Sequence, residues 1–290
     1  MTPTNRPITS REYKLMLNTE RFRDRRAGAG LFWKLLTFLV ENQGNEVISD
    51  QVDHLEKDAE KIRTTWYLDT PGYELQRANI TLRVREEPGA KSPFKVTLKF
   101  RAPDRYTAAG CDVRCTQEVA DDDLKFEEDV VPPFVSKFSY SVSFKSKDLP
   151  AIKTMGDTVG IFPGLAAYDF PGKTPLRVVN GFRAHEVAHF IGKLKLDKMP
   201  TERGLREMPD FVVKVALNHW YLRPDENDYP LVTEFSFGFD ANSQAKEDRL
   251  EMFPPTVVAG ANRLFRDVQN QAGWLAQFGS TKTAYAFEVL

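Results

Sequence analysis

Two histidines and a glutamate, His185, Glu186 and His189, stand together in the segment HEVAH. On one face of a helix this spacing lets both imidazoles bind zinc, while the carboxylate serves as general base toward a metal-bound water. The apolar residues around them recur at helical spacing, namely Val187, Phe190, Ile191 and Leu194. Residues four apart also share one face of a strand, however, and the following GKLKLD alternates as a strand does.

A zinc peptidase also needs a third protein ligand. No histidine follows at the spacing of a G-x-x-H element, but Glu202, Glu207 or Glu226 could supply a carboxylate. The zinc hypothesis predicts stoichiometric zinc and loss of activity in the variant Glu186→Gln.

A second set of candidate residues lies on segments in which charged and apolar side chains alternate. Because successive side chains of a strand point to opposite faces, residues two apart share a face. Glu12 shares a face with Lys14 in EYKL, and Glu234 shares one with Ser236 in VTEFSFGF. In three further strands the charged face carries Arg83 and Arg85 with Thr81, Lys99 and Arg101 with Thr97, and Glu127 and Asp129 with Lys125.

The charged face of a single strand simply meets water, but five such strands together favour an enclosed polar interior. Their apolar faces then need a cover, and two segments are predicted to be helices that supply it. One begins by Leu31, with Gly44 as its stop, and the other covers residues 254–278. Many short strands with a few helices are typical of an α+β fold built on an antiparallel sheet or barrel.

Basic groups that converge from several strands suit one kind of ligand. Guanidinium and ammonium groups recognise phosphate oxygens, and arginine does so with two parallel hydrogen bonds. Carboxylates beside them suit Mg²⁺ or Mn²⁺, hard ions that prefer oxygen ligands and bridge polyphosphate oxygens. The pattern therefore indicates phosphoryl transfer, in which catalysis rests on positioning and charge stabilisation.

The composition makes any anion site a local feature. The 290 residues are 41% hydrophobic and carry a formal net charge of −1, so no global charge attracts nucleic acid or an anionic membrane. The most apolar run, LFWKLLTFLV, is too short to span a bilayer. The N-terminal segment has no signal-peptide pattern, and we expect a cytoplasmic protein. Cys111 and Cys115 are expected to be incidental thiols.

These residues resemble the motifs of the CYTH domain, or triphosphate tunnel metalloenzyme, family. YLDTPGYELQRANITLRVR is similar to that family's Tyr-x-Asp-Thr-Pro passage, and Thr97-Leu98-Lys99 is similar to its next strand. SREYKL resembles the opening Glu-x-Glu-x-Lys strand, KFEEDV the acidic strand, VTEFSF the late Glu-x-Glu strand, and STKTAYAF the closing Ser-Lys segment. The resemblance covers most of the chain and is most specific over residues 65–101.

The resemblance implies a single domain, residues 1–290, whose core is an eight-stranded antiparallel β-barrel, the triphosphate tunnel, with helices packed outside. Insertions would lie near 18–60, 102–123 and 198–210. The implied ligand is a small-molecule triphosphate with Mg²⁺ or Mn²⁺, and Glu12, Lys14 and Arg83 would act in catalysis. The implied metal-side carboxylates are Glu12, Glu127, Asp129 and Glu234, and the implied phosphate contacts are Lys14, Arg83, Arg85, Lys99, Arg101, Arg183, His185 and Lys282.

Two departures from the family bear on turnover. Ser10 and Ser236 stand where the family has carboxylates, and fewer charged ligands weaken the binding of a divalent ion. The leading hypothesis is a metal-dependent hydrolase of inorganic triphosphate or an organic triphosphate, with a cyclase as a variant of it. A binding module with little turnover and the HEVAH zinc peptidase are the alternatives.

Overall fold

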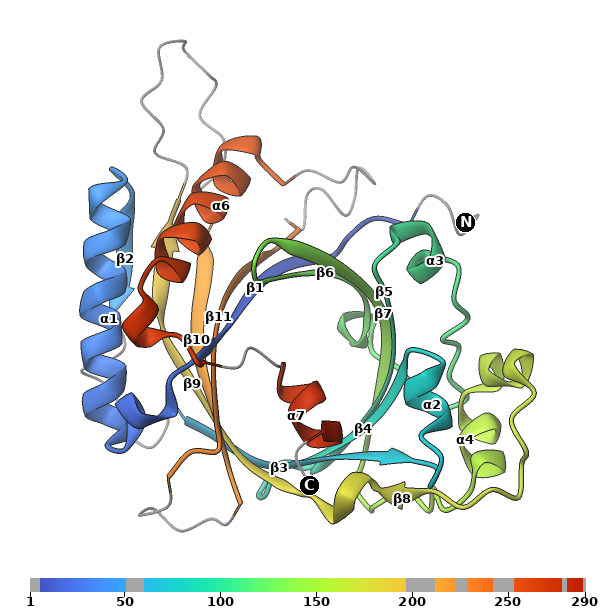
Figure 1. Cartoon of the computed structure of the whole chain (residues 1–290). Coiled ribbons are helices and arrows are strands. Elements are labelled where there is room, and N and C mark those ends of the chain that lie inside the picture. The colour runs from blue at the N-terminus through green and yellow to red at the C-terminus, as the bar shows by residue number, and fades with distance from the viewer. Residues whose placement is uncertain are drawn as a thin grey trace.

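A ring of β-strands forms the centre of the protein (Figure 1). The structure is a computed structural model and describes residues 6–50, 60–196, 212–222, 229–241, 253–277 and 281–288. The ring strands are β1 (Ser10–Leu17), β3 (Glu60–Asp69), β4 (Ile80–Glu86), β5 (Phe94–Ala102), β6 (Leu124–Val131), β7 (Val135–Ser146), β9 (Ala184–Lys195), β10 (Val213–Tyr221) and β11 (Val232–Asp240). Two short strands lie beside the ring, β2 (Glu46–Asp50) on β9 and β8 (Arg177–Val178) on β3.

The ring closes through hydrogen bonds between β3 and β9 and contains nine strands, in the order β9-β10-β11-β1-β6-β7-β5-β4-β3. The α+β class is confirmed, but the expected eight-stranded, wholly antiparallel barrel is wrong. A closed ring whose neighbours all alternate in direction needs an even number of strands. The ninth strand is accommodated because β1 and β6 run parallel, with Ser10 opposite Glu127 and Glu12 opposite Asp129. Parallel neighbours need a long connection, and more than a hundred residues separate β1 from β6 along the chain.

The apolar faces of the strands point out of the ring and form two large cores, and a third, smaller cluster, which includes Tyr67, Trp220 and Ala286, lies around α7 (Lys282–Glu288). One core joins the outer faces of β1 and β9–β11 to α1 (Arg25–Asn42) and α6 (Pro255–Gln269), which lie side by side outside the ring (Figure 1). Its centre contains Tyr13, stacked on Phe237 with ring centroids 4.8 Å apart. The other core lies outside β4, β5 and β7 and contains Leu82, Val84 and Leu98.

Short helices cover the second core. They are α2 (Glu74–Arg77), α3 (Arg105–Ala109), α4 (Met155–Ile161) and the 3₁₀ segment η5 (Pro163–Tyr168). Further 3₁₀ turns are η2 (Thr19–Phe22), η4 (Asp121–Asp123), η6 (Val179–Gly181) and η7 (Ala272–Trp274). With both faces of the sheet specified in this way, each strand register is fixed, because a slip by one residue would expose its apolar set to the polar interior.

Local signals in the sequence set the ends of the long helix α1. Its N-cap is Asp24, whose carboxylate accepts a hydrogen bond from the backbone N–H of Ala27 at 3.0 Å. The chain leaves the helix at Gly44, whose positive φ of 70° suits glycine. The helix and β2 fill part of the region expected as an insertion near 18–60, whereas the one near 198–210 lies outside the described residues.

The last helix, α7 (Lys282–Glu288), lies in one opening of the ring (Figure 1). Its Phe287 ring contacts those of Tyr67 and Tyr73, with centroids 5.8 and 5.9 Å away. The side-chain amide of Asn180 donates to the carbonyl of Ala286 at 3.0 Å. One end of the ring is thereby narrowed by a helix. Within the described residues, no helix has the length and apolar character needed to cross a membrane.

Candidate functional site: a basic tunnel inside the ring

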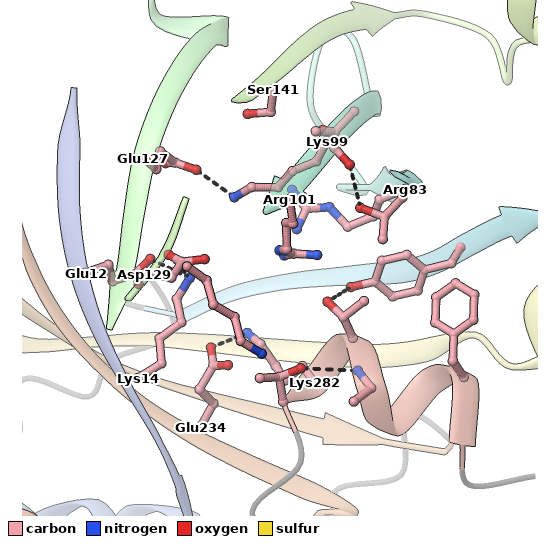
Figure 2. Close-up of a pocket in the computed structure, with 18 of the residues that line it drawn as sticks. Glu12, Lys14, Arg83, Lys99, Arg101, Glu127, Asp129, Ser141, Glu234 and Lys282 are labelled. Carbon is pink, nitrogen blue, oxygen red and sulfur yellow. Dashed lines mark hydrogen bonds and ion pairs between the residues drawn. The ribbon is translucent and has the colours of Figure 1, made fainter. Parts of the chain in front are cut away.

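The interior of the ring is a polar cavity of about 500 Å³ (Figure 2). In the described part of the chain, ten basic side chains line it: Lys14, Arg63, Arg83, Arg85, Lys95, Lys99, Arg101, Lys125, Lys137 and Lys282. Five carboxylates of the same described residues line it as well, namely Glu12, Glu127, Asp129, Glu234 and Glu288. A chain with almost no net charge thus gathers an excess of positive charge in one enclosed place. Such a cavity attracts anions.

Strand alternation places these side chains. On β4 and β5, Arg83, Arg85, Lys99 and Arg101 point into the cavity, while the apolar residues between them pack in the outer core. The structure therefore brings together ten of the twelve residues that the sequence motifs singled out. The two exceptions are Arg183 and His185, which do not line the cavity.

The acidic side of the cavity centres on Lys14. Its ammonium lies 2.7 Å from Asp129 and 2.9 Å from Glu12, two carboxylates on the parallel neighbours β6 and β1 (Figure 2). Burial alone would lower the pKa of Lys14, but the charges of Asp129, Glu12 and Glu234 outweigh that effect and raise it. For Asp129 the same contact works in reverse: burial would raise its pKa, and Lys14 with Lys99 holds it below its usual range. Both groups are therefore charged near neutral pH.

The other two candidate carboxylates also have lysine partners. The ammonium of Lys99 donates to Glu127 at 2.7 Å, and Lys282, at the start of α7, lies 2.9 Å from Glu234 (Figure 2). Burial lowers the pKa of Lys99, although Glu127 partly offsets this. Each of the four carboxylates thus already has a cationic partner.

On the basic side of the cavity, the arginines have fewer carboxylate partners than their charges and N–H groups require. The Nε–H groups of Arg63, Arg83 and Arg85 are all buried, and none has a hydrogen-bond partner among the described residues. Within the same residues, Arg83 has no carboxylate at ion-pair distance, and the nearest to Arg85 is Glu186 at 3.7 Å. Burial lowers the pKa of Arg85 to about 9, and the positive charge of Arg83 adds to the effect. A buried guanidinium that lacks partners points to an anionic ligand.

Glu186, the central residue of HEVAH, faces this arginine cluster. Its side chain is fully buried, accepts hydrogen bonds from Arg63 at 2.9 Å and from the Thr65 hydroxyl at 2.7 Å, and lies 3.7 Å from Lys282. Burial would raise its pKa, but Arg85, Lys282 and Arg63 hold it well below the ordinary value. The residue is therefore a charged structural partner of the basic wall.

The expectation that Arg183 and His185 face the tunnel is wrong, because the inward-facing positions of this segment are offset by one residue from the expected ones. HEVAH lies on the strand β9, so Glu186 points inward and its neighbours point outward. The guanidinium of Arg183 stacks over the ring of Trp66 in the outer core, 4.2 Å from its centroid. His185 lies beside Tyr221, with ring centroids 6.5 Å apart.

The strand conformation also removes the helix on which a HEVAH zinc site depends. His189 contacts Glu60 outside the ring, while Glu186 lies inside it. Behind His189, the buried His219 pairs its Nδ1 with the hydroxyl of Thr233 at 3.0 Å. Among the residues that the structure describes, no group of three or more His, Cys, Asp or Glu side chains could hold a metal ion. The proposed third ligands Glu202, Glu207 and Glu226 lie outside those residues.

The positions of the carboxylates show whether the cavity could bind the expected Mg²⁺ or Mn²⁺. Four acids do not converge on one point, but Glu12 and Asp129 both lie within hydrogen-bond distance of the same ammonium group. Mg²⁺ is commonly held by one or two carboxylates together with phosphate oxygens and water. The pair fits an ion that arrives with a phosphate ligand and does not fit a metal cage built by the protein alone.

Several lining residues were missed from the sequence. Arg63 extends the inward face of β3, but it lies in a run of charges from Asp53 to Arg63 that obscures the start of that strand. Lys95 precedes the alternating core of β5, and Lys137 follows a Pro-Pro turn. For Arg63 and Lys95 the signal was present, because both continue the alternation of their strands by two residues or more.

No protein-family model and no curated protein matches the chain. Solved structures do. A "putative adenylate cyclase" from Bacillus halodurans aligns with 97% of this chain and 100% of its own length, at 11% identity and a TM-score of 0.42. A "putative adenylyl cyclase" from Hippeastrum, described as having a dominant triphosphatase activity, aligns over 96% and 95% at 11% identity, with a TM-score of 0.41.

A third such protein, from Vibrio parahaemolyticus, aligns with 96% of this chain and 95% of its own at 10% identity, with a TM-score of 0.31. These three solved structures are adenylate-cyclase-like proteins of the CYTH, or triphosphate tunnel, family, which is the family that the sequence motifs resemble.

Proposed function

We propose that the tunnel binds inorganic triphosphate, or the triphosphate group of an organic molecule, and hydrolyses its terminal phosphoanhydride. The observation that carries the proposal is the cluster of Arg63, Arg83 and Arg85, whose buried Nε–H groups have no partner among the described residues. Among the described residues, Glu186 is the one carboxylate at ion-pair distance from this cluster, so the remaining positive charge is stabilised when a polyanion enters. A triphosphate supplies several charges in a row, as a tunnel requires.

The basic residues divide between binding and reaction. Lys99, Arg101 and Lys282 line the walls with Arg85 and would hold the chain of phosphates, since arginine can bind a phosphate through two hydrogen bonds. Arg83 has no competing carboxylate among the described residues and would stabilise the charge that develops on the reacting phosphate. Arg183 and His185, which lie outside the cavity, have no part in this assignment.

Hydrolysis needs water to attack the terminal phosphorus while the bond to the bridging oxygen breaks, so that orthophosphate and the shortened phosphate leave. Mg²⁺ or Mn²⁺ held near Glu12 and Asp129 would supply additional positive charge to the phosphate oxygens. Lys14 orients these two carboxylates through its contacts with both. Asp129, with its lowered pKa, is a weak base and a good charged ligand.

A binding module with little turnover is the second candidate. It is favoured by Ser10, which stands in an acid position of the family motif and whose hydroxyl lies 3.3 Å from Glu127. It is also favoured by Ser236, which is buried in β11 and is the register partner of Lys14. With fewer carboxylates, a phosphate-bound metal ion is held more weakly.

The test is phosphate release from inorganic triphosphate and from ATP, with Mg²⁺, with Mn²⁺ and with EDTA. We expect metal-stimulated release that falls by about a hundredfold in Arg83→Ala, the usual loss when one charge-stabilising donor is removed. Arg177→Ala, which changes an exposed arginine outside the ring, is the matched control. Tight binding of triphosphate without phosphate release would favour the binding module. No binding and no release would refute both.

A further inference from the structure

A second basic cavity, of about 450 Å³, opens at the end of the ring opposite α7. The first residues of β3 and β5, the last residues of β4 and β7 and the loop 87–93 form its walls. Helix α7 instead contacts Tyr67, near the last residues of β3. We call this second cavity the basic mouth and define it by Lys61, Lys91 and Lys145 together with Arg63, Arg85 and Lys95.

The basic mouth is continuous with the tunnel. Arg63, Arg85 and Lys95 line both cavities, so basic groups lead from the interior to the outer opening without a break. Of the described charged residues that line the mouth, six are basic and one, Glu87, is acidic. Two of the three shared residues, Arg63 and Arg85, carry the buried Nε–H groups that lack partners. The anion expected in the tunnel therefore meets further positive charge where it leaves.

The chemistry of the mouth distinguishes between leaving groups. Among the residues that the structure describes, its lining contains no aromatic residue, and Ala90 and Pro93 are its only apolar members. A nucleobase would find no described aromatic ring to stack on here, whereas additional phosphates would find ammonium and guanidinium groups. At the opposite end of the ring of strands, the aromatic side chain of Phe287 on α7 packs against Tyr67 and Tyr73.

We propose that the basic mouth binds the further phosphates of a linear inorganic polyphosphate longer than triphosphate, whose end lies in the tunnel. The proposal rests on the proposed function, because it takes the tunnel to be the place where the terminal phosphates bind. It names the substrate class as an unbranched polyanion without an organic group. Three exposed lysines, Lys61, Lys91 and Lys145, distinguish the long chain from triphosphate.

The experiment measures binding by calorimetry to the full chain for two probes, inorganic triphosphate and a longer linear inorganic polyphosphate of uniform length. The test variant changes Lys61, Lys91 and Lys145 to alanine. Its matched control changes Lys34, Lys153 and Lys173, three exposed lysines away from the ring openings. We expect the test variant to lose about tenfold in affinity for the long chain, as for three partly exposed ion pairs, and to bind triphosphate as the wild type does. The control should bind both probes unchanged.

Each other result overturns a specific part of the proposal. If the wild type binds triphosphate but the test variant keeps full affinity for the long chain, the mouth proposal fails and the proposed function stands. If the wild type binds neither probe, both fail. A single-stranded oligothymidylate is the third probe, and binding that depends on the same three lysines as strongly as polyphosphate does would overturn the assignment of the ligand class.

Discussion

Replacing Glu186 by glutamine tests whether this buried carboxylate balances the positive charge of the tunnel when no anionic ligand is bound. Glutamine preserves the shape of the side chain and removes its charge. In the native protein this fully buried carboxylate accepts from Arg63 at 2.9 Å and from Thr65 at 2.7 Å, with Arg85 and Lys282 each at 3.7 Å. The substitution leaves three cations around a neutral group.

The ion pairs of Glu186 determine how much stability the substitution removes. Breaking a buried ion pair by removing one partner destabilises a protein by about 3–5 kcal/mol. The cationic partners here retain some access to the cavity, with side-chain exposures of 17% for Arg63, 21% for Arg85 and 13% for Lys282, so the lower end applies. A loss of about 3 kcal/mol corresponds to a fall in the melting temperature of roughly 6–12 °C.

The assay is thermal unfolding of Glu186→Gln and wild type in phosphate-free buffer, with and without inorganic triphosphate. Triphosphate should raise both melting temperatures, and it should raise the variant's more, because the polyanion replaces the missing charge. The gap between the two proteins should therefore narrow on binding. A variant as stable as wild type without ligand, or a gap that stays constant or widens with triphosphate, would refute the reasoning.

Two further predictions concern the outer cores. Burial keeps the pKa of His219 well below its ordinary value, helped by the charge on His189, so its stabilising effect is present above about pH 6.5 and declines as pH falls below it. In His219→Asn, urea unfolding at a series of pH values should show the slope of stability against pH between about 5 and 6.5 reduced by up to about 1.4 kcal/mol per pH unit, and an unchanged slope would contradict this. Gly260→Ala would place a Cβ 2.1 Å from the carbonyl oxygen of Leu196 and should destabilise by about 1–3 kcal/mol in urea, whereas Gly160→Ala, with nothing within 4 Å, should not. Equal stability of the two glycine variants would show that α6 does not pack as described.

The alternation of charged and apolar residues along the strands is the sequence feature that predicted most of the site. Where charged and apolar residues alternate without interruption, as at Arg83 and Arg85 or Lys99 and Arg101, the face of each side chain follows from its position. The cover of helices then determines that the charged face points inward. These features are local, and they are sufficient to identify most of the charged lining residues.

The same rule failed where the start of a strand depends on tertiary contacts. In β9 the segment HEVAH fits a helix or either phase of a strand, and only its pairing with β3 and β10 places Glu186 inside and His185 outside. Pairing also decides the number of strands. The parallel contact between β1 and β6 joins residues more than a hundred positions apart, and no local pattern reports it.

The central claim is that the ring arginines whose buried Nε–H groups lack partners among the described residues bind a triphosphate. Calorimetric titration of inorganic triphosphate into the wild type and Arg83→Ala tests it most directly. Arg83 has no ion-pair partner among the described residues and lies beside Arg85, so its removal relieves repulsion and leaves the ligand-free protein at least as stable, which a melting curve verifies. We predict one-to-one binding by the wild type and an affinity about tenfold to a hundredfold lower in the variant, as for a lost charged hydrogen bond. Equal affinity in a folded variant, or no binding by the wild type with or without Mg²⁺, would contradict the claim.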